Sequence, residues 1–295
     1  MSLNVFGCPR TSLQTHFGIS ANEKTGDNFH TCGLFITASY INHSCHSNSR
    51  RSFIGDMQIV RAARDIPAGT EITFWYAIAG PTDTYDKTQE KLANWGFRCT
   101  CITCQENGRT GKARLNKRVA LYKELESIGN NIESVDLSAA KRVSAAIEQT
   151  YTSPATTVPR LALWELYLGL TRHHTLHNRS AHVITYAWKM LTSLGFVIKR
   201  EVPASLTAIF EVAQWGLVLG PVVETWVHLW VAYATLAPNL CSKCEGYARL
   251  TYKICIGEDE TFDEHYGRAA RKAMCEGTNL MVELGKIGAG AGQTM

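Results

Sequence analysis

The sequence has no concentration of positive charge, because 30 lysines and arginines are balanced by 26 aspartates and glutamates and leave a formal net charge of only +4. A protein that binds nucleic acid usually gathers its basic residues into a patch or a stripe. No basic run of the kind that marks nuclear localisation is found either. We therefore expect no direct binding of nucleic acid.

The first twenty residues lack the long apolar core of a secretory signal peptide, and they include Arg10, Gln14 and His16. Ten cysteines would suit a disulfide framework only in a short secreted chain. We therefore expect an intracellular protein whose cysteines are reduced and partly bound to metal. The sequence does not resolve nucleus from cytoplasm.

One stretch, residues 217–237, is mostly apolar and long enough to cross a membrane. It also contains Pro221, Glu224 and His228. A carboxylate in the middle of a single span is costly. The pattern favours a buried helix that starts after Pro221, and we expect no membrane association.

Short strands and turns are predicted for the first hundred residues. Residues 57–62 alternate polar and apolar side chains, as a half-buried strand does. Gly55 and Asp56 precede them and suit a tight hairpin turn from residues 52–54. A second turn is expected at residues 65–69, followed by a strand over residues 71–76 that is rich in β-branched and aromatic side chains.

The pattern becomes helical after Cys104. The polar residues 105–112 are interpreted as a linker, residues 152–159 as a loop and the glycine-rich residues 285–295 as a frayed tail. No clean 34-residue repeat is found. Pro203 suits a helix start. Apolar side chains recur at helical spacing in four stripes, namely Leu115, Val119, Tyr122 and Leu125; Val183, Ile184, Ala187, Met190, Leu191 and Leu194; Leu206, Ile209, Phe210, Ala213 and Leu217; and Leu240, Cys244, Tyr247, Thr251 and Ile254.

Three cysteines within six residues, Cys99, Cys101 and Cys104, form the densest candidate metal site. A C-x-C-x2-C turn can place three thiolates around one zinc ion, and the fourth ligand must come from elsewhere in the chain. The alternative is a set of ordinary buried cysteines. Such close spacing is uncommon in core packing, so we favour zinc.

Two weaker motifs have simpler explanations. Cys241 and Cys244 lie on a predicted helix with Cys255 further on, where thiols in the core or at the surface are favoured over a second zinc site. His173 and His177 are one helical turn apart, but no H-E-x-x-H pattern accompanies them. We interpret them as a polar helix end.

Three motifs follow one another in a fixed order. The first is Asn42-His43-Ser44-Cys45, the second is Gly69-x-Glu71-Ile72-Thr73-x-x-Tyr76, and the third joins Trp95-x-Phe97 to the three clustered cysteines. Together they resemble the C-terminal half of a SET domain, closest to the SET-MYND type and its fungal relatives with a helical C-terminal domain. The resemblance covers roughly residues 11–104.

The resemblance implies an α+β fold in which the C-terminal half of a β-rich SET domain and a zinc-binding post-SET segment precede an all-α, TPR-like helical domain. The expected divisions are residues 1–105 for the partial SET domain, 106–150 for linker and helices, 151–284 for the helical domain and 285–295 for a flexible tail.

The resemblance also implies a function, the transfer of methyl groups from S-adenosylmethionine to lysine side chains of a histone or non-histone protein. Tyr76 falls at the position of the catalytic tyrosine. The remaining site residues implied in this way are Ser39, Asn42, His43 and Phe97 for the cofactor, Phe17 and Trp95 for the substrate channel, and Cys45, Cys99, Cys101 and Cys104 for a closed structural zinc site.

The chemistry of methyl transfer suits these residue types. A lysine must be neutral to displace a methyl group from a sulfonium, so a dry site that disfavours its charge helps the reaction. Aromatic walls can hold the cationic lysine before it loses its proton. The hydroxyl of Tyr76 would orient the amine. His43 is the alternative general base, but no carboxylate partner for its ring is evident.

The sequence departs from the family pattern at its N-terminal side. No glycine-rich strand turn for the cofactor is recognised between Met1 and Thr31, no MYND insert is found, and Thr15 stands where the family usually has asparagine. Two functions therefore remain open. One is a SET-type protein-lysine methyltransferase truncated in this chain, and the other is an inactive SET remnant that acts as a zinc-pinned protein-interaction module.

Overall fold

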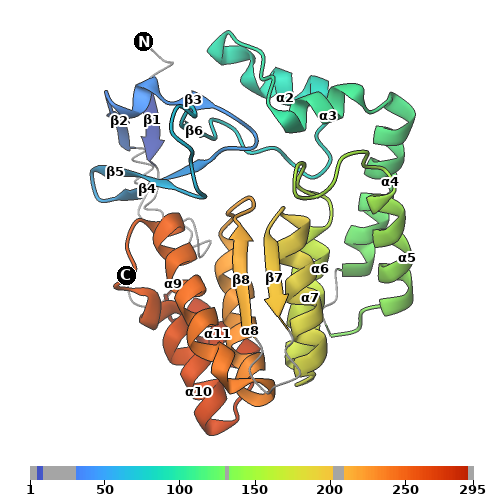
Figure 1. Ribbon diagram of the computed structural model, residues 1–295, viewed down its shortest axis with the longest axis vertical. Coiled ribbons are helices and arrows are strands. Elements are labelled where there is room, and N and C mark those ends of the chain that lie inside the picture. The colour runs from blue at the N-terminus through green and yellow to red at the C-terminus, as the bar shows by residue number, and fades with distance from the viewer. Residues whose placement is uncertain (1–4, 9–30, 130–132, 202–208, 292–295) are drawn as a thin grey trace.

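The computed structural model of the protein describes residues 5–8, 31–129, 133–201 and 209–291. Short strands make up its N-terminal part and helices most of the rest, so the fold is α+β, as predicted (Figure 1). Phe17 and the proposed helix start at Pro203 lie outside the described residues.

The described strands of the N-terminal part pair two by two. β1 (Val5–Cys8) runs antiparallel to β2 (Thr31–Leu34), and β4 (Ser49–Ile54) runs antiparallel to β5 (Met57–Ala62). The predicted hairpin turn is confirmed, and Gly55 has the positive φ of 57° that a tight hairpin turn asks of glycine. β3 (Asn42–His43) and β6 (Thr73–Phe74) form a parallel pair, and β6 is shorter than the predicted strand over residues 71–76.

Two helices surround the cysteine motif. Thr84 caps the N-terminus of α2 (Tyr85–Leu92), because its hydroxyl accepts the Lys87 N–H. A 3-10 turn (Ala93–Trp95) follows the helix. α3 (Ile102–Arg109) begins within the motif itself. The predicted linker over residues 105–112 is therefore wrong, because α3 occupies most of it and α4 begins at Lys112.

Helices build the remainder of the molecule. α4 and α5 flank it on one side, while α6 to α9 pack in sequence order, each against the next (Figure 1). Their shared core includes the fully buried Trp226, Tyr252 and Phe262. The helices are α4 (Lys112–Gly129), α5 (Leu137–Glu148), α6 (Trp164–Leu176), α7 (Ser180–Ser193), α8 (Pro221–Leu236), α9 (Cys241–Ile256), α10 (Arg268–Glu276) and α11 (Leu280–Ala291), with a π-helical turn (Asp263–Gly267) before α10.

A β-hairpin interrupts this helical region, so the prediction of an all-α domain is wrong. β7 (Val197–Glu201) pairs antiparallel with β8 (Ile209–Gln214). Phe210 and Val212 are buried while Glu211 and Ala213 are exposed, which is the alternation of a strand. Of the residues proposed for a helical stripe here, Phe210 lies on the buried face of the strand and Ala213 on the exposed face.

The apolar stretch at residues 217–237 contains a buried helix, as predicted. α8 begins at Pro221, and Val222, Trp226 and Leu229 on it are fully buried. Among the described residues, no helix is both long and apolar enough to cross a membrane. The glycine-rich end differs from the prediction, because α11 continues through residues 285–291.

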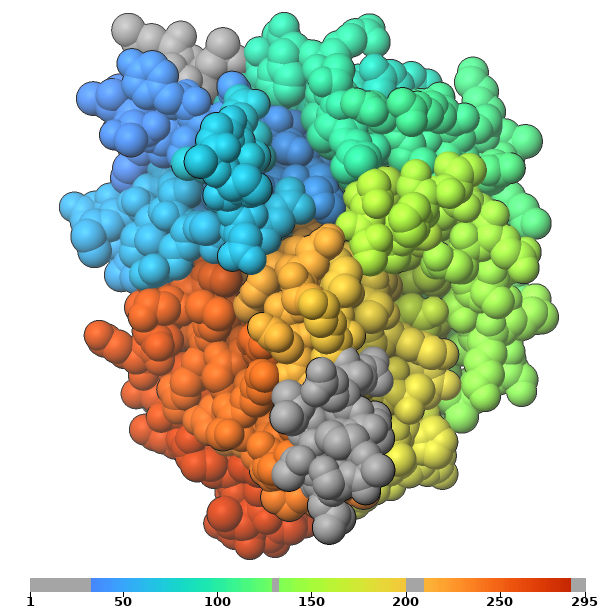
Figure 2. Space-filling model, in the orientation of Figure 1, coloured from blue at the N-terminus to red at the C-terminus, as the bar shows by residue number. Residues whose placement is uncertain are grey.

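The N-terminal part sits against the helical region (Figure 2). Arg50 donates to the Val218 carbonyl at 2.8 Å, and Arg61 donates to the Gly257 carbonyl at 2.9 Å. A cavity of about 290 Å³ lies along this contact, with Trp75 on one side and Trp164 on the other. The two parts thus meet through direct hydrogen bonds as well as apolar contact.

Candidate active site and metal centre

Four cysteine thiols converge between β3 and the start of α3. The Sγ atoms of Cys45, Cys99, Cys101 and Cys104 all lie within 4.8 Å of one another. Cys45, Cys99 and Cys104 are buried and Cys101 is half-buried. The chain thus brings together all four predicted ligands, although Cys45 lies 54 residues from Cys99.

The spacing of these sulfurs fits a tetrahedral ion. Zinc–sulfur bonds of about 2.3 Å place the sulfurs of a tetrahedral site about 3.8 Å apart. Cys45 Sγ lies 3.9 Å from Cys99 Sγ and 3.7 Å from Cys104 Sγ. The donor set therefore suits zinc, which prefers four thiolates in its structural sites.

The pKa values of the four thiols differ, because hydrogen bonds between them lower two and raise the other two. Hydrogen bonding with Cys104 lowers the pKa of Cys101 to about 6, and hydrogen bonding with Cys101 lowers the pKa of Cys99. The same contacts raise the pKa of Cys45 and of Cys104. Such crowding favours a cation, which allows all four groups to ionise together.

Two side chains contact the sulfurs from outside the cluster. Gln89 on α2 donates to Cys104 Sγ at 3.7 Å, and its amide also accepts the Cys99 N–H and donates to the Cys99 carbonyl. His43 Nε2 lies 3.3 Å from Cys45 Sγ. Outer partners of this kind orient metal ligands. The sequence offered no spacing signal for Gln89, because nothing distinguishes it from other polar helix residues.

Three aromatic rings gather beside the cluster. The ring centroid of Tyr76 lies 5.4 Å from that of Trp95 and 6.0 Å from that of Phe97. The His43 ring completes the group at 5.5 Å from Tyr76 and 6.0 Å from Phe97. Residues far apart in sequence thus form one aromatic enclosure, which we define as Tyr76, Trp95, Phe97 and His43.

The chain also resembles proteins of known name. The SET domain profile matches residues 10–77. Over 270 residues the chain is 37% identical to a Gibberella zeae protein named "Methyltransferase", a region that covers 89% of this chain and 37% of that relative. Residues 10–77 thus match a SET domain, and most of the chain is similar to a protein named as a methyltransferase.

Two relatives that match over shorter stretches are named as histone-lysine N-methyltransferases. Histone-lysine N-methyltransferase SET5 of Meyerozyma guilliermondii is 36% identical over 107 residues, or 34% of this chain and 21% of that protein. Histone-lysine N-methyltransferase SMYD3 of Mus musculus is 27% identical over 135 residues, or 45% of this chain and 31% of that protein. The chain therefore matches less than two-fifths of the length of each of these relatives.

Within the SET domain, the Tyr76 hydroxyl is held by the backbone. It donates to the Ile41 carbonyl at 2.8 Å, just before the Asn42-His43 pair. Burial raises the pKa of this phenol, and the nearby Arg51 opposes that rise. The hydroxyl is accordingly a protonated hydrogen-bond donor at neutral pH.

The polar residues predicted to contact the cofactor have partners within the chain. The Asn42 side-chain amide donates to Glu71 at 2.6 Å, and the Ser39 hydroxyl donates to the Phe35 carbonyl at 2.9 Å. Both nitrogens of His43 face protein groups, Cys45 Sγ and the Tyr76 N–H. A cofactor role for these side chains remains a prediction.

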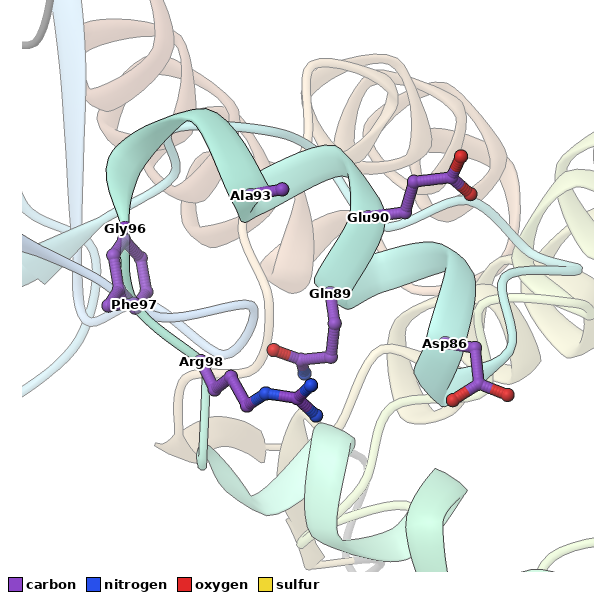
Figure 3. A pocket seen from close by; sticks show the side chains of 7 residues that line it. All are labelled: Asp86, Gln89, Glu90, Ala93, Gly96, Phe97 and Arg98. Carbon is purple, nitrogen blue, oxygen red and sulfur yellow. The ribbon is translucent and has the colours of Figure 1, made fainter.

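Phe97 also lines a surface cavity of about 450 Å³ beside α2. Its other walls include Asp86, Glu90 and Arg98, so it combines an aromatic face with charged groups (Figure 3). The volume is within the range of small-molecule sites. This cavity and the aromatic enclosure share the Phe97 residue.

The remaining candidate motifs lie away from the enclosure. Cys244 and Cys255 are buried in the core of the helical region, in agreement with the preference for packing thiols. His173 and His177 are near the end of α6, with ring centroids 4.6 Å apart, but His173 is buried rather than part of a polar helix end.

Proposed function

We propose that this chain provides the Tyr76 side of a SET-type protein-lysine N-methyltransferase that uses S-adenosylmethionine. The observation that carries the proposal is the aromatic enclosure, built from three separate sequence motifs and held beside four converging thiols. Histone-lysine substrates of the relatives suggest a protein substrate, histone or non-histone, for this chain. The expected location is intracellular.

Tyr76 would position the lysine in this reaction. Bound S-adenosylmethionine supplies an electrophilic methyl group and a positive charge that disfavours a protonated amine nearby. The rings of Tyr76 and Trp95 exclude water and offer faces for the alkyl chain and its cation. The Tyr76 hydroxyl, which donates to the Ile41 carbonyl, would be the polar group that orients the amine.

Phe97 would cover the adenine. It lies where the aromatic enclosure meets the cavity of about 450 Å³, so one face of that cavity is aromatic. Asp86 and Glu90 add carboxylates that can accept hydrogen bonds from ribose hydroxyls. Asn42, exposed at the end of β3, would exchange its contact with Glu71 for one with the cofactor.

The zinc would be structural. Four protein sulfurs leave no open coordination position for chemistry. The ion would fix the segment after β6 and α2 against the Asn42-to-Cys45 turn, and so hold Phe97 and Trp95 against Tyr76.

A methyl-transfer assay with labelled S-adenosylmethionine and a panel of histones and lysine peptides tests this function. Tyr76→Phe should reduce transfer by roughly 10²-fold or more, as loss of an oriented polar group does, while cofactor binding is retained. Wild-type activity that Tyr76→Phe leaves unchanged would contradict the assignment. Trp164→Phe, outside the enclosure, is the matched control.

The alternative function is a non-catalytic, zinc-pinned module that binds a protein partner through the helical region. Its specific support is that Ser39, Asn42 and His43 already have protein partners. Calorimetry with S-adenosylmethionine separates the two functions. Binding supports the enzyme, and absence of binding by folded, zinc-loaded protein supports the module.

A further inference from the structure

We propose that His43 is a positioning residue whose single tautomer links the metal centre to the aromatic enclosure. It would donate one N–H to the metal-bound Cys45 thiolate and accept one N–H from Tyr76. This inference rests on the zinc site of the proposed function, and it does not depend on methyl transfer.

The backbone fixes the tautomer. The Tyr76 N–H donates to His43 Nδ1 at 3.0 Å, so this nitrogen must carry a lone pair rather than a proton. A neutral imidazole then has its proton on Nε2. That atom lies 3.3 Å from Cys45 Sγ, where it can only be the donor.

The ring has little freedom to leave this position. His43 is 9% exposed and lies on β3, opposite Phe74 of β6. The rings of Tyr76 and Phe97 pack against it at tilted angles, with centroids 5.5 Å and 6.0 Å from that of His43. Turning the ring over would break both hydrogen bonds and leave the part-buried Tyr76 N–H without its acceptor, which is costly.

The two contacts have distinct consequences. An N–H donated to a metal-bound thiolate stabilises its negative charge, as other outer partners of metal ligands do. The acceptor nitrogen holds the Tyr76 backbone, and with it the phenol that donates to the Ile41 carbonyl. Because both nitrogens are occupied, His43 has no free nitrogen to act as a general base on the substrate amine.

Two substitutions, His43→Phe and His43→Gln, separate the hydrogen bonds of His43 from the packing of its ring. Phenylalanine keeps an aromatic ring against Tyr76 and Phe97 but removes both polar atoms. Glutamine restores one donor and one acceptor. Zinc retention of the full chain, measured by competition with a chromogenic chelator, should fall about 10–100-fold in His43→Phe. His43→Gln should recover part of that loss.

Phe97→Leu is the control for packing, because it removes a ring that contacts His43 but no hydrogen bond to sulfur. It should leave zinc retention unchanged. Equal retention in wild type and His43→Phe would overturn the proposal, as would a Phe97→Leu loss as large as that of His43→Phe. Wild type that binds no zinc would overturn it together with the metal site, a distinguishable result.

A measurement on wild type alone covers the case in which His43→Phe does not fold. Nitrogen-15 NMR of the zinc-loaded chain should show the His43 ring protonated on Nε2 and unprotonated on Nδ1. A proton on Nδ1 would contradict the inference. Cobalt substitution offers a second signature, since His43→Phe should shift the sulfur-to-cobalt charge-transfer band and Phe97→Leu should not.

Discussion

Glu106 is a single buried carboxylate that ties the segment after the cysteine cluster to the helical region. It is 4% exposed, and it accepts hydrogen bonds from the N–H and hydroxyl of both Thr152 and Ser153, the shortest at 2.7 Å. Burial alone would raise the pKa of this carboxyl, but those four donors outweigh it and lower the pKa to about 2.

Glu106 should therefore stabilise the fold in a pH-dependent way. A folded-state pKa below the ordinary value contributes stability that is complete above about pH 4.5 and is lost as the pH falls toward 2. Glu106→Gln should cost about 2 kcal/mol near neutral pH, because a charged acceptor is lost from the network. Urea unfolding at pH 7 and pH 3 measures the difference, which should shrink at the lower pH.

Glu124→Gln is the matched control, because Glu124 pairs with Arg142 and the two side chains are 41% and 66% exposed. An exposed ion pair contributes only about 0–1 kcal/mol. A Glu106→Gln cost that stays constant from pH 7 to pH 3 would contradict the assigned role.

Cysteine spacing predicts three residues of the metal centre and the family resemblance implies the fourth, Cys45, but neither predicts their surroundings. Cys99, Cys101 and Cys104 are recognisable because three thiols in six residues seldom occur for packing alone. Gln89 and Glu106 were not predicted, since a polar residue on a short helix is usually solvated. Their contacts are set by tertiary structure, which brings Thr152 to Glu106 across 46 residues.

At the scale of elements, the end of α9 meets the β4–β5 hairpin at Gly257. This glycine has a φ of +104°, and a Cβ there would approach Ser52 Oγ to 2.8 Å. Its carbonyl accepts the hydrogen bond from Arg61. The glycine is needed both for the helix end and for close contact between the two parts of the molecule.

Gly257→Ala should destabilise the protein by about 1–3 kcal/mol through backbone strain and overpacking. Gly246→Ala in the same helix is the control, because a Cβ at that position meets nothing within 4 Å. It should be neutral or stabilise by up to about 1 kcal/mol, since alanine is the better helix former. Equal unfolding midpoints for the two variants would contradict the account.

The β7–β8 hairpin shows where periodicity fails as a guide to elements. Ile209, Phe210, Ala213 and Leu217 suit a helical stripe, yet Phe210 and Val212 also suit the inner face of a strand. Phe210 packs between Trp188 and Trp226 in the folded protein, with ring centroids at 5.1 Å and 6.2 Å. Tertiary packing decided between two local patterns that the sequence allows.

At the scale of the whole molecule, the apolar cores of the described residues differ in size. The cluster around the cysteines has few fully buried apolar residues, whereas the helical core extends from α6 to α11. A small core usually needs a metal or another cross-link to be stable. We therefore expect zinc to stabilise the N-terminal part much more than the helical region.

Hydrogen exchange with and without a chelator tests this division. Chelation should speed exchange in α2, α3 and the turn after β3, while α7, α8 and α9 keep their protection. Uniform loss of protection across the chain would show a single cooperative unit instead. Cys275→Ser, at an exposed thiol, should behave as wild type.

The central claim is that one zinc ion joins Cys45 to the cysteines of the later motif. X-ray absorption at the zinc edge of the purified chain tests it most directly. We expect one zinc per chain with four sulfur neighbours at about 2.3 Å, and a loss of that signal in Cys45→Ser and Cys99→Ser. A protein without zinc, or a zinc ion bound by nitrogen and oxygen, would contradict it.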